Sequence, residues 1–364
     1  MSMIEKFVSL FGVPDFVVPY LSWFVSEAEM DLVVRLEGQK CSVSEVAKRM
    51  GCASEQAQGL LEGCYYKHIV QREEIDGEIV YFGADFYGRL DYMCKFDDSY
   101  KLEIRSLKAN NIDDERDKDK DNNDNNDSND DNNNNEKVKD DGGDLLKALD
   151  EWCYQVYAER MEPYLEQLRN KEAVDRAPET FFMIDELEEL LNSVKDIRLV
   201  PCNCRKLAER CEKPTETCLS FDASITDRTY GRSLSKDEAR EIVILSHRKG
   251  LMHQINSDWR EKGPTWMCNC CSCCCYPTRL AQDRGMKGIF PVIQYVAQRN
   301  EVKCSHCGAC VKRCNFSAFQ LGETEIMVNG KPRKRVEFDQ DKCWGCGICV
   351  DSCVTKAISM VSLG

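Results

Sequence analysis

Apolar residues recur at helical spacing through the N-terminal part of the chain and then alternate with polar residues over two short runs. Three segments begin at a serine able to cap a helix and are predicted to be helices, at residues 26–36, 42–50 and 54–68. Two strands joined by an Asp-Gly turn are predicted to follow, at residues 69–75 and 78–82. Three helices followed by a hairpin predict a winged-helix-like region.

An apolar stretch at residues 7–25 precedes these helices and is long enough to raise the question of a membrane span. Pro14, Asp15 and Pro19 interrupt it, and a proline inside a helix removes a backbone hydrogen bond. We therefore expect a pair of buried helices here and no membrane span.

Beyond residue 144 the helical period returns, and helices begin to alternate with strands. The predicted elements are a helix that Pro163 ends, a helix at residues 185–194, a strand at 197–200, and a helix at 236–249 opened by a capping box at Ser235 and Glu238. This alternation predicts a central α/β region. Nearer the C-terminus, Asn329-Gly330 predicts a hairpin between residues 325–328 and 335–338.

Negative charge is concentrated in one hydrophilic stretch. Residues 110–144 carry nine of the fourteen net negative charges of the 364-residue chain, and residues 121–135 contain no apolar residue. A segment of this composition cannot form a core, so we expect a disordered insertion. The rest of the chain is only mildly acidic and is long enough for several hydrophobic cores.

The chain contains 23 cysteines, an odd number, with many of them in tight runs, and it opens without a recognisable signal peptide. These three features argue against a secreted disulfide scaffold, so we expect a reducing compartment, with the cytoplasm as the default. The cysteines that stand alone in the sequence are interpreted as buried thiols: Cys41, Cys52, Cys64, Cys94 and Cys153.

The pattern CxxCxxCxxxC occurs twice near the C-terminus. Cysteines at this spacing place three thiolates around one [4Fe-4S] cube, and the fourth, a helical turn further on, reaches the other cube. The first cluster is predicted to bind Cys304, Cys307, Cys310 and Cys353, and the second Cys343, Cys346, Cys349 and Cys314. Structural zinc sites, the alternative, would not need the third cysteine or the CxxxC tail.

These residues resemble the bacterial-type ferredoxins that carry two [4Fe-4S] clusters, over about the last sixty positions. The resemblance implies a ferredoxin-like domain. Members of that family usually have proline after each fourth cysteine, whereas this sequence has Asn315 and Val354. The departure leaves the ligand set intact but changes the loops that follow it.

A second group of ten cysteines lies upstream, in two segments. They are Cys202, Cys204, Cys211 and Cys218 in the first segment, and Cys268, Cys270, Cys271, Cys273, Cys274 and Cys275 in the second. Neighbouring residues on an extended backbone point to opposite sides, so the ten thiols cannot all bind one metal. Either the first four form one site and four of the later six another, or one site is shared between the segments. A further iron-sulfur cluster is favoured over zinc, and Arg205 would offset its charge.

The order PCxCR, GLxHxxN, CNCCxCCC and tandem ferredoxin also resembles a family of 4Fe-4S dicluster proteins from anaerobes. This resemblance implies a winged-helix-like beginning and places His253 and Asn256 at the central site. For His253 the alternative is a buried, hydrogen-bonded histidine.

The sequence therefore predicts an α+β, multidomain chain. Its expected parts are a helical, winged-helix-like domain at 1–95, a helical connection at 96–173 with the disordered insertion at 110–144, a Cys-rich central α/β domain at 174–299, and a 2[4Fe-4S] ferredoxin-like domain at 300–364.

The leading functional prediction is an iron-sulfur protein that passes single electrons through two [4Fe-4S] clusters to or from a partner protein or the central site. The alternatives are an oxidoreductase acting at the central site and a redox-sensing winged-helix regulator. Nucleic-acid binding is not expected, because the predicted recognition helix carries Glu55 and Glu62 against a single Lys67. The sequence contains no GxGxxG or Walker motif, so NAD, flavin or ATP chemistry is not predicted.

Overall fold

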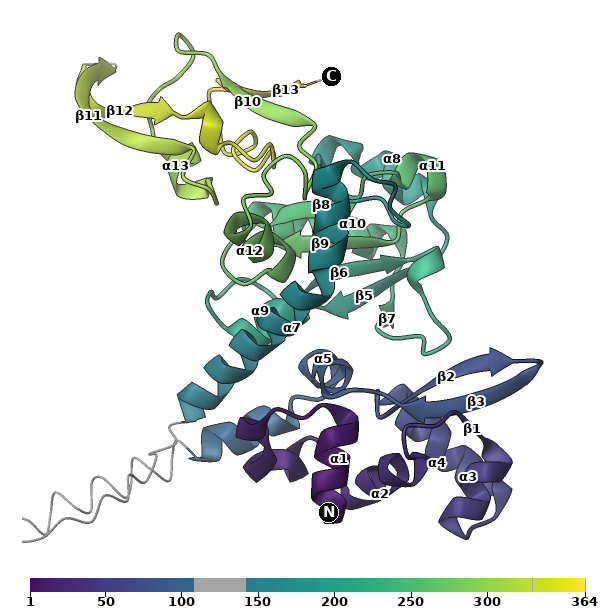
Figure 1. The fold of residues 1–364 in the computed structure, drawn as a ribbon. Helices are drawn as coiled ribbons and strands as arrows, with labels where there is room; N and C mark the ends of the chain where they lie inside the picture. The colour runs from purple at the N-terminus through teal and green to yellow at the C-terminus, as the bar shows by residue number, and fades with distance from the viewer. Residues whose placement is uncertain (108–141, 329, 364) are drawn as a thin grey trace, which may run out of the picture. The chain divides into compact units, whose positions relative to one another are not determined.

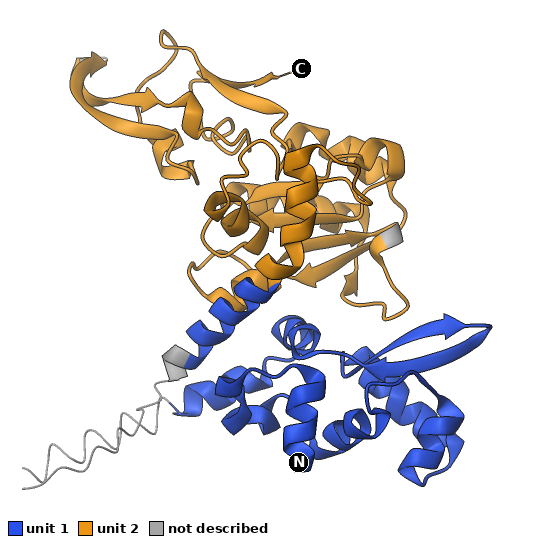
Figure 2. Cartoon of the chain, viewed as in Figure 1, with its two compact units in different colours: residues 1–156 blue, residues 157–364 orange. Residues whose placement is uncertain are grey.

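The computed structural model describes residues 1–107, 142–328 and 330–363. These residues form two compact units, residues 1–156 and 157–364 (Figure 2). The predicted disordered insertion lies outside the described residues except at its end, where helix α7 begins at Gly142. Within the described ranges every helix is too short or too polar to span a bilayer.

Unit 1 combines helices with a small sheet (Figure 1). Its elements are α1 (Met3–Phe11), the 3-10 helix η1 (Asp15–Trp23), α2 (Glu27–Leu36), β1 (Cys41–Ser42), α3 (Val43–Met50), α4 (Ser54–Tyr66), β2 (Val70–Ile75), β3 (Glu78–Gly83) and α5 (Phe86–Phe96). The strands form an antiparallel sheet in the order β1-β3-β2. The three predicted helices and both strands are confirmed to within two residues at each end.

Serine residues set where the first α-helices of unit 1 begin. In α1, α2 and α3 a serine side chain accepts the third backbone N–H, and the glutamate at that position accepts the N–H of the serine. The apolar opening stretch folds as α1 and η1, and Phe7, Phe11 and Val17 are fully buried. This agrees with the expected pair of buried helices.

Helix α7 (Gly142–Asn170) continues through the predicted stop at Pro163, so that prediction is wrong. Proline inside a helix costs about 3 kcal/mol, because it removes a hydrogen bond and crowds the preceding turn. Apolar side chains on both sides of it are buried, Leu149 in unit 1 and Ala158 and Leu165 in unit 2. Packing along this length offsets the cost of the proline.

Unit 2 is built on a six-stranded antiparallel sheet in the order β4-β8-β9-β6-β5-β7. The strands are β4 (Glu179–Phe182), β5 (Ile197–Pro201), β6 (Glu216–Phe221), β7 (Arg232–Ser233), β8 (Met252–Asn256) and β9 (Trp266–Cys270). The helices are η2 (Ile184–Glu186), α8 (Leu187–Ser193), α9 (Asn203–Ala208), η3 (Asp222–Ser224), α10 (Lys236–Arg248), α11 (Trp259–Lys262) and α12 (Tyr276–Asp283). Leu190 of α8, Val243 of α10 and Phe221 of β6 are fully buried in its core.

Two antiparallel strand pairs make up the rest of unit 2. They are β10 (Tyr295–Arg299) with β13 (Ile358–Ser362), and β11 (Phe319–Val328) with β12 (Lys331–Phe338). In sequence, helix α13 (Ala309–Arg313) lies between β10 and β11, and helix η4 (Gln340–Lys342) lies between β12 and β13. The β11–β12 hairpin is longer than predicted, and residue 329 in its turn lies outside the described residues. The mixture of helices and strands agrees with the predicted α+β class.

Candidate metal centre

The two CxxCxxCxxxC motifs belong to a backbone repeat with a constant spacing of 39 residues. Positive φ angles recur at matched positions, at His306 and Gly345, Gly308 and Gly347, and Ser317 and Lys356. Strands β11 and β13 begin at the same place in the repeat. The two halves therefore share one local fold although few side chains besides the cysteines are the same.

The fourth cysteine of each motif accepts a backbone hydrogen bond at its sulfur. The N–H of Ala318 donates to Cys314 Sγ (3.2 Å), and the N–H of Ala357 donates to Cys353 Sγ (3.1 Å). Amide bonds of this kind stabilise thiolates and tune the clusters that they hold. Cysteines of both motifs also border an apolar cluster that contains residues of strands β10, β11, β12 and β13. The eight predicted cysteines thus fit an iron-sulfur group.

The two motifs differ in what covers them. Cys307 of the first motif is exposed, whereas Cys346 at the matching position is partly covered. A side chain added at Gly347 would come within 2.9 Å of the sulfur of Met183, which follows β4. The second motif is therefore packed against Met183 at Gly347, whereas Cys307 of the first motif faces solvent.

Two residues beside Cys314, the last cysteine of the first motif, attach this segment to the end of helix α10. The guanidinium of Arg313 donates to the backbone oxygen of His247 (2.7 Å) and to that of the next residue (2.5 Å). Asn315 donates to the oxygen of Gly250 (3.2 Å), and its own side-chain oxygen accepts from Lys213 (3.4 Å). Asn315 stands where ferredoxin-like sequences usually have proline, and proline has no side-chain donor for this contact. Asparagine in place of proline at position 315 therefore helps to hold this segment against Gly250 and Lys213.

A chain of polar side chains, buried except at Asp351, connects the second motif to strand β9. Asp351 lies 2.7 Å from His247 Nε2, His247 Nδ1 lies 3.0 Å from His253 Nε2, and His253 Nδ1 lies 2.5 Å from Asn269 Oδ1. Burial, together with the neighbouring His247, lowers the pKa of His253 to about 3, so this ring is neutral. His253 is the buried, hydrogen-bonded histidine that the sequence offered as the alternative.

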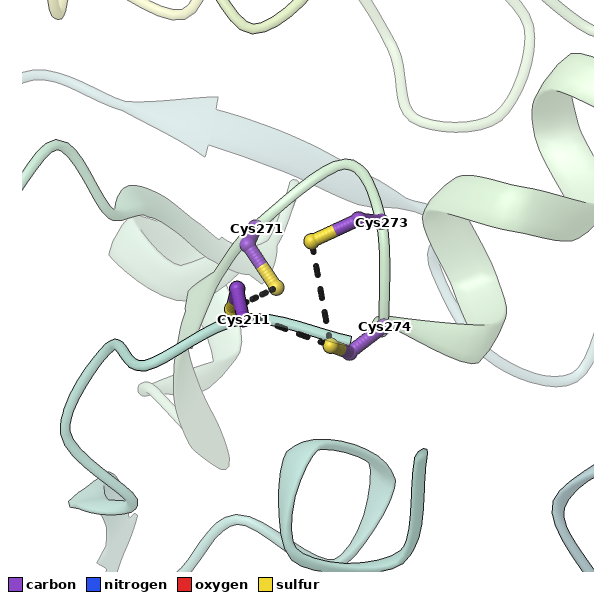
Figure 3. Close-up of side chains that lie close together, drawn as sticks. All are labelled: Cys211, Cys271, Cys273 and Cys274. Atoms are coloured by element: carbon purple, nitrogen blue, oxygen red, sulfur yellow. Dashed lines mark hydrogen bonds between the residues drawn. The ribbon is translucent and has the colours of Figure 1, made fainter. Parts of the chain in front are cut away.

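Four of the ten central thiols converge on one point, shown in Figure 3. Cys211 comes from the loop after α9, and Cys271, Cys273 and Cys274 come from the turn between β9 and α12. The Sγ atom of Cys211 lies 3.8 Å from those of Cys271 and Cys274, and Cys273 Sγ lies 3.7 Å from Cys274 Sγ. This four-thiol group draws on both sequence segments.

The other six cysteines form a second, more extended set, the six-thiol group. Each of these thiols affects the pKa of the next in the order Cys204, Cys202, Cys218, Cys268, Cys270 and Cys275, and the Sγ atoms of Cys270 and Cys275 lie 3.3 Å apart. Strand geometry explains the division, because Cys268 and Cys270 share one face of β9 and the next residue, Cys271, leaves the strand. Hydrogen bonds from Cys218 and Cys270 lower the pKa of Cys268 to about 6, which favours its thiolate form.

Arg205 lies between the two thiol groups and is almost completely buried. Its guanidinium donates to the backbone oxygens of Pro214 (2.6 Å) and Asn269 (2.7 Å). Burial disfavours its charge, but Cys202 and Cys271 outweigh that effect and raise the pKa of Arg205. The predicted role of Arg205 in offsetting thiolate charge agrees with this position.

A cavity of about 650 Å³ opens beside the six-thiol group, with Cys268 in its wall. Tyr157, Glu179 and Asn256 also line it. Burial raises the pKa of Glu179, with Arg176 offsetting part of the effect, and burial beside Glu179 holds the pKa of Tyr157 well above its usual range. Asn256 thus borders this cavity, close to the predicted site, and is bonded to the backbone of Gly263 (3.1 Å).

Sequence reasoning missed the polar groups that surround these thiols. His247, Glu179 and Tyr157 occur in no spacing pattern that marks a site. Asn269 could have been predicted from the sequence, since in Cys-Asn-Cys on a strand the asparagine lies on the face opposite Cys268 and Cys270.

Comparison with known proteins adds one finding. Residues 303–357 match a protein family described as a 4Fe-4S dicluster domain. No curated protein and no solved structure matches the chain. The similarity covers the two cysteine motifs and supports iron-sulfur binding and electron transfer in the C-terminal part of the chain.

Proposed function

We propose that this chain is an electron-transfer protein with two [4Fe-4S] clusters in its C-terminal part and a further iron-sulfur cluster at the six-thiol group. The cluster ligands are Cys304, Cys307, Cys310 and Cys353 for the first, and Cys343, Cys346, Cys349 and Cys314 for the second. The observation that carries the proposal is the 39-residue repeat with its paired N–H bonds to Cys314 and Cys353. When bound, such clusters accept and release single electrons.

The exposure and the contacts of the cysteine motifs distinguish the proposed roles of the two clusters. Cys307, a proposed ligand of the first cluster, faces solvent, so a redox partner protein can approach it. Cys314, a proposed ligand of the second cluster, lies between Arg313 and Asn315, which bond to the end of helix α10, to Gly250 and to Lys213, two residues beyond Cys211. We therefore propose that the first cluster meets the partner and that the second cluster serves the central site.

Metal analysis tests this proposal directly. After anaerobic reconstitution we expect about twelve irons and about twelve sulfides per chain, and about eight after replacement of Cys270 with alanine. Cys52→Ser, at an isolated cysteine, is the matched control and should retain the full content. A wild-type chain with fewer than about eight irons would contradict the two C-terminal clusters, and an unchanged Cys270→Ala chain would contradict the central one.

The cavity beside Cys268 favours a second candidate function, an oxidoreductase acting on a small molecule. A reducible site next to a cavity with the protonatable groups Glu179 and Tyr157 has the parts that coupled electron and proton delivery needs. In the metal-free protein, iodoacetamide should alkylate Cys268 faster than the neighbouring Cys270, because Cys268 lines the cavity and its pKa is lowered. Equal alkylation, measured by peptide mass spectrometry, would show that the cavity gives no access.

For unit 1 we propose a winged-helix-like module that packs or dimerises and does not bind nucleic acid. The element order α2, β1, α3, α4, β2 and β3 supports the first part. Helix α4 exposes Glu55 and Glu62, and the nearby Lys67 pairs with Glu29 at 3.3 Å. Measurable binding of duplex DNA at low salt would overturn this.

A further inference from the structure

We propose that Cys211, Cys271, Cys273 and Cys274 bind a single zinc ion in a tetrahedral, four-thiolate site that is distinct from every iron-sulfur cluster of the chain. The site goes beyond the electron-transfer function, because zinc has no redox chemistry. Zinc at these residues replaces the earlier preference for a further cluster there.

The sulfur separations carry the proposal. In a tetrahedral site with zinc-sulfur bonds of about 2.3 Å, neighbouring sulfurs lie about 3.8 Å apart. The three sulfur pairs measured here lie at 3.7 and 3.8 Å, and all four sulfurs lie within 4.8 Å of one another. A [4Fe-4S] cube binds each thiolate at a different iron, which spreads the sulfurs to roughly 6 Å or more. The four-thiol group is too compact for a cube and matches one ion.

The ferredoxin-like motifs provide an internal comparison. Among the described residues, the four-thiol group is the one set of cysteine, histidine or acidic side chains this compact. The eight cysteines from Cys304 to Cys353 form no such set, as expected of ligands that surround a cube. Within the same chain, therefore, the two arrangements of cysteines are of different kinds.

The surroundings suit a closed, structural zinc site. All four coordination positions are supplied by cysteine, which leaves none for substrate or water. Cys271 and Cys274 are fully buried against Leu251, while Cys211 and Cys273 keep some exposure through which an ion can enter. The guanidinium of Arg205 interacts with Cys271 and partly compensates the negative charge that four thiolates leave around one divalent ion.

The ion would hold the loop after α9 to the turn after β9. Two residues beyond Cys211, Lys213 donates to the backbone oxygen of Gly250 (3.0 Å) and to Asn315 (3.4 Å). The loop that zinc anchors is thus the loop that meets the segment after Cys314. A redox-inert ion here fixes the position of the segment around Cys314 without taking part in electron transfer.

Metal analysis of the full-length chain, produced with both iron and zinc supplied and purified without oxygen, tests the proposal. We expect about one zinc per chain besides the iron, and X-ray absorption at the zinc edge should show four sulfur neighbours at about 2.3 Å. Cobalt in place of zinc should give the visible bands of a tetrahedral thiolate site. These measurements use the wild-type chain and do not depend on whether a variant folds.

Two variants locate the ion. Cys211→Ser and Cys273→Ser should each lose the zinc while the iron and sulfide contents stay unchanged, and Cys52→Ser should retain all three. Absence of zinc from an iron-loaded wild-type chain overturns the site. Loss of about four irons and four sulfides from Cys211→Ser also overturns it, in favour of a cube. The proposed function fails separately, through the iron content of the wild-type chain.

Discussion

Replacement of Cys314 with alanine is expected to lower the iron and sulfide content by about four each, and the number of electrons taken up in a reductive titration by about one. Cys314 belongs to the first motif in sequence but is the proposed fourth ligand of the cluster of Cys343, Cys346 and Cys349. Its sulfur accepts the N–H of Ala318, so the loss of the ligand also leaves this amide without its partner.

Cys353→Ala is the matched control, since Cys353 occupies the same position in the other half of the repeat and accepts the N–H of Ala357. Both variants should lose about the same amount of iron. Only Cys314→Ala should also speed amide hydrogen exchange at residues 247–251, because Arg313 and Asn315 on either side of it bond to that segment. Equal exchange in the two variants would show that cluster binding and docking are independent.

Replacement of Arg205 with methionine is expected to destabilise unit 2 by about 3 to 5 kcal/mol. The change removes a buried positive charge from beside Cys202 and Cys271, and it leaves the carbonyl oxygens of Pro214 and Asn269 buried without donors. Methionine has a similar length, so packing is largely kept. Urea unfolding at fixed metal content, followed by circular dichroism, measures the effect.

Arg198 offers a control for this prediction. It also donates to two backbone oxygens, those of Thr229 (2.8 Å) and Gly231 (2.9 Å), but it lies near the surface of the sheet. Water can replace those bonds, so Arg198→Met should cost about 1 kcal/mol or less. Equal losses in the two variants would mean that the thiol groups gain nothing from the buried charge.

Patterns among neighbouring residues were enough to predict most of the helices and strands described above. The serine caps at Ser26 and Ser42 fix helix starts through contacts within three residues, and such contacts are visible in sequence. The continuation of α7 past Pro163 was not predictable in the same way, because it depends on the burial of Leu165 and other side chains against residues distant in sequence. Local preference was overridden there by packing.

The same distinction applies to the metal centre. The spacing of the C-terminal cysteines is enough to predict their ligand sets, since each predicted set is built from one short loop and one residue of the other half. The central thiols have no such spacing. Cys211 meets Cys271 across 60 positions, and the division between Cys270 and Cys271 depends on where β9 ends. Only the folded sheet determines which neighbouring thiols point together.

The contact between Arg313 and the end of α10 has a consequence for biosynthesis. The last carbonyl oxygens of this helix receive donors from a residue more than sixty positions further along the chain. A ribosome releases the N-terminal residues first, so until the segment of Arg313 has emerged the end of α10 has only its local bonds from the N–H groups of Lys249 and Gly250. During that interval Lys213, two residues beyond Cys211, lacks its contact with Asn315. The loop of Cys211 therefore receives its last partner only after synthesis has passed the first cysteine motif.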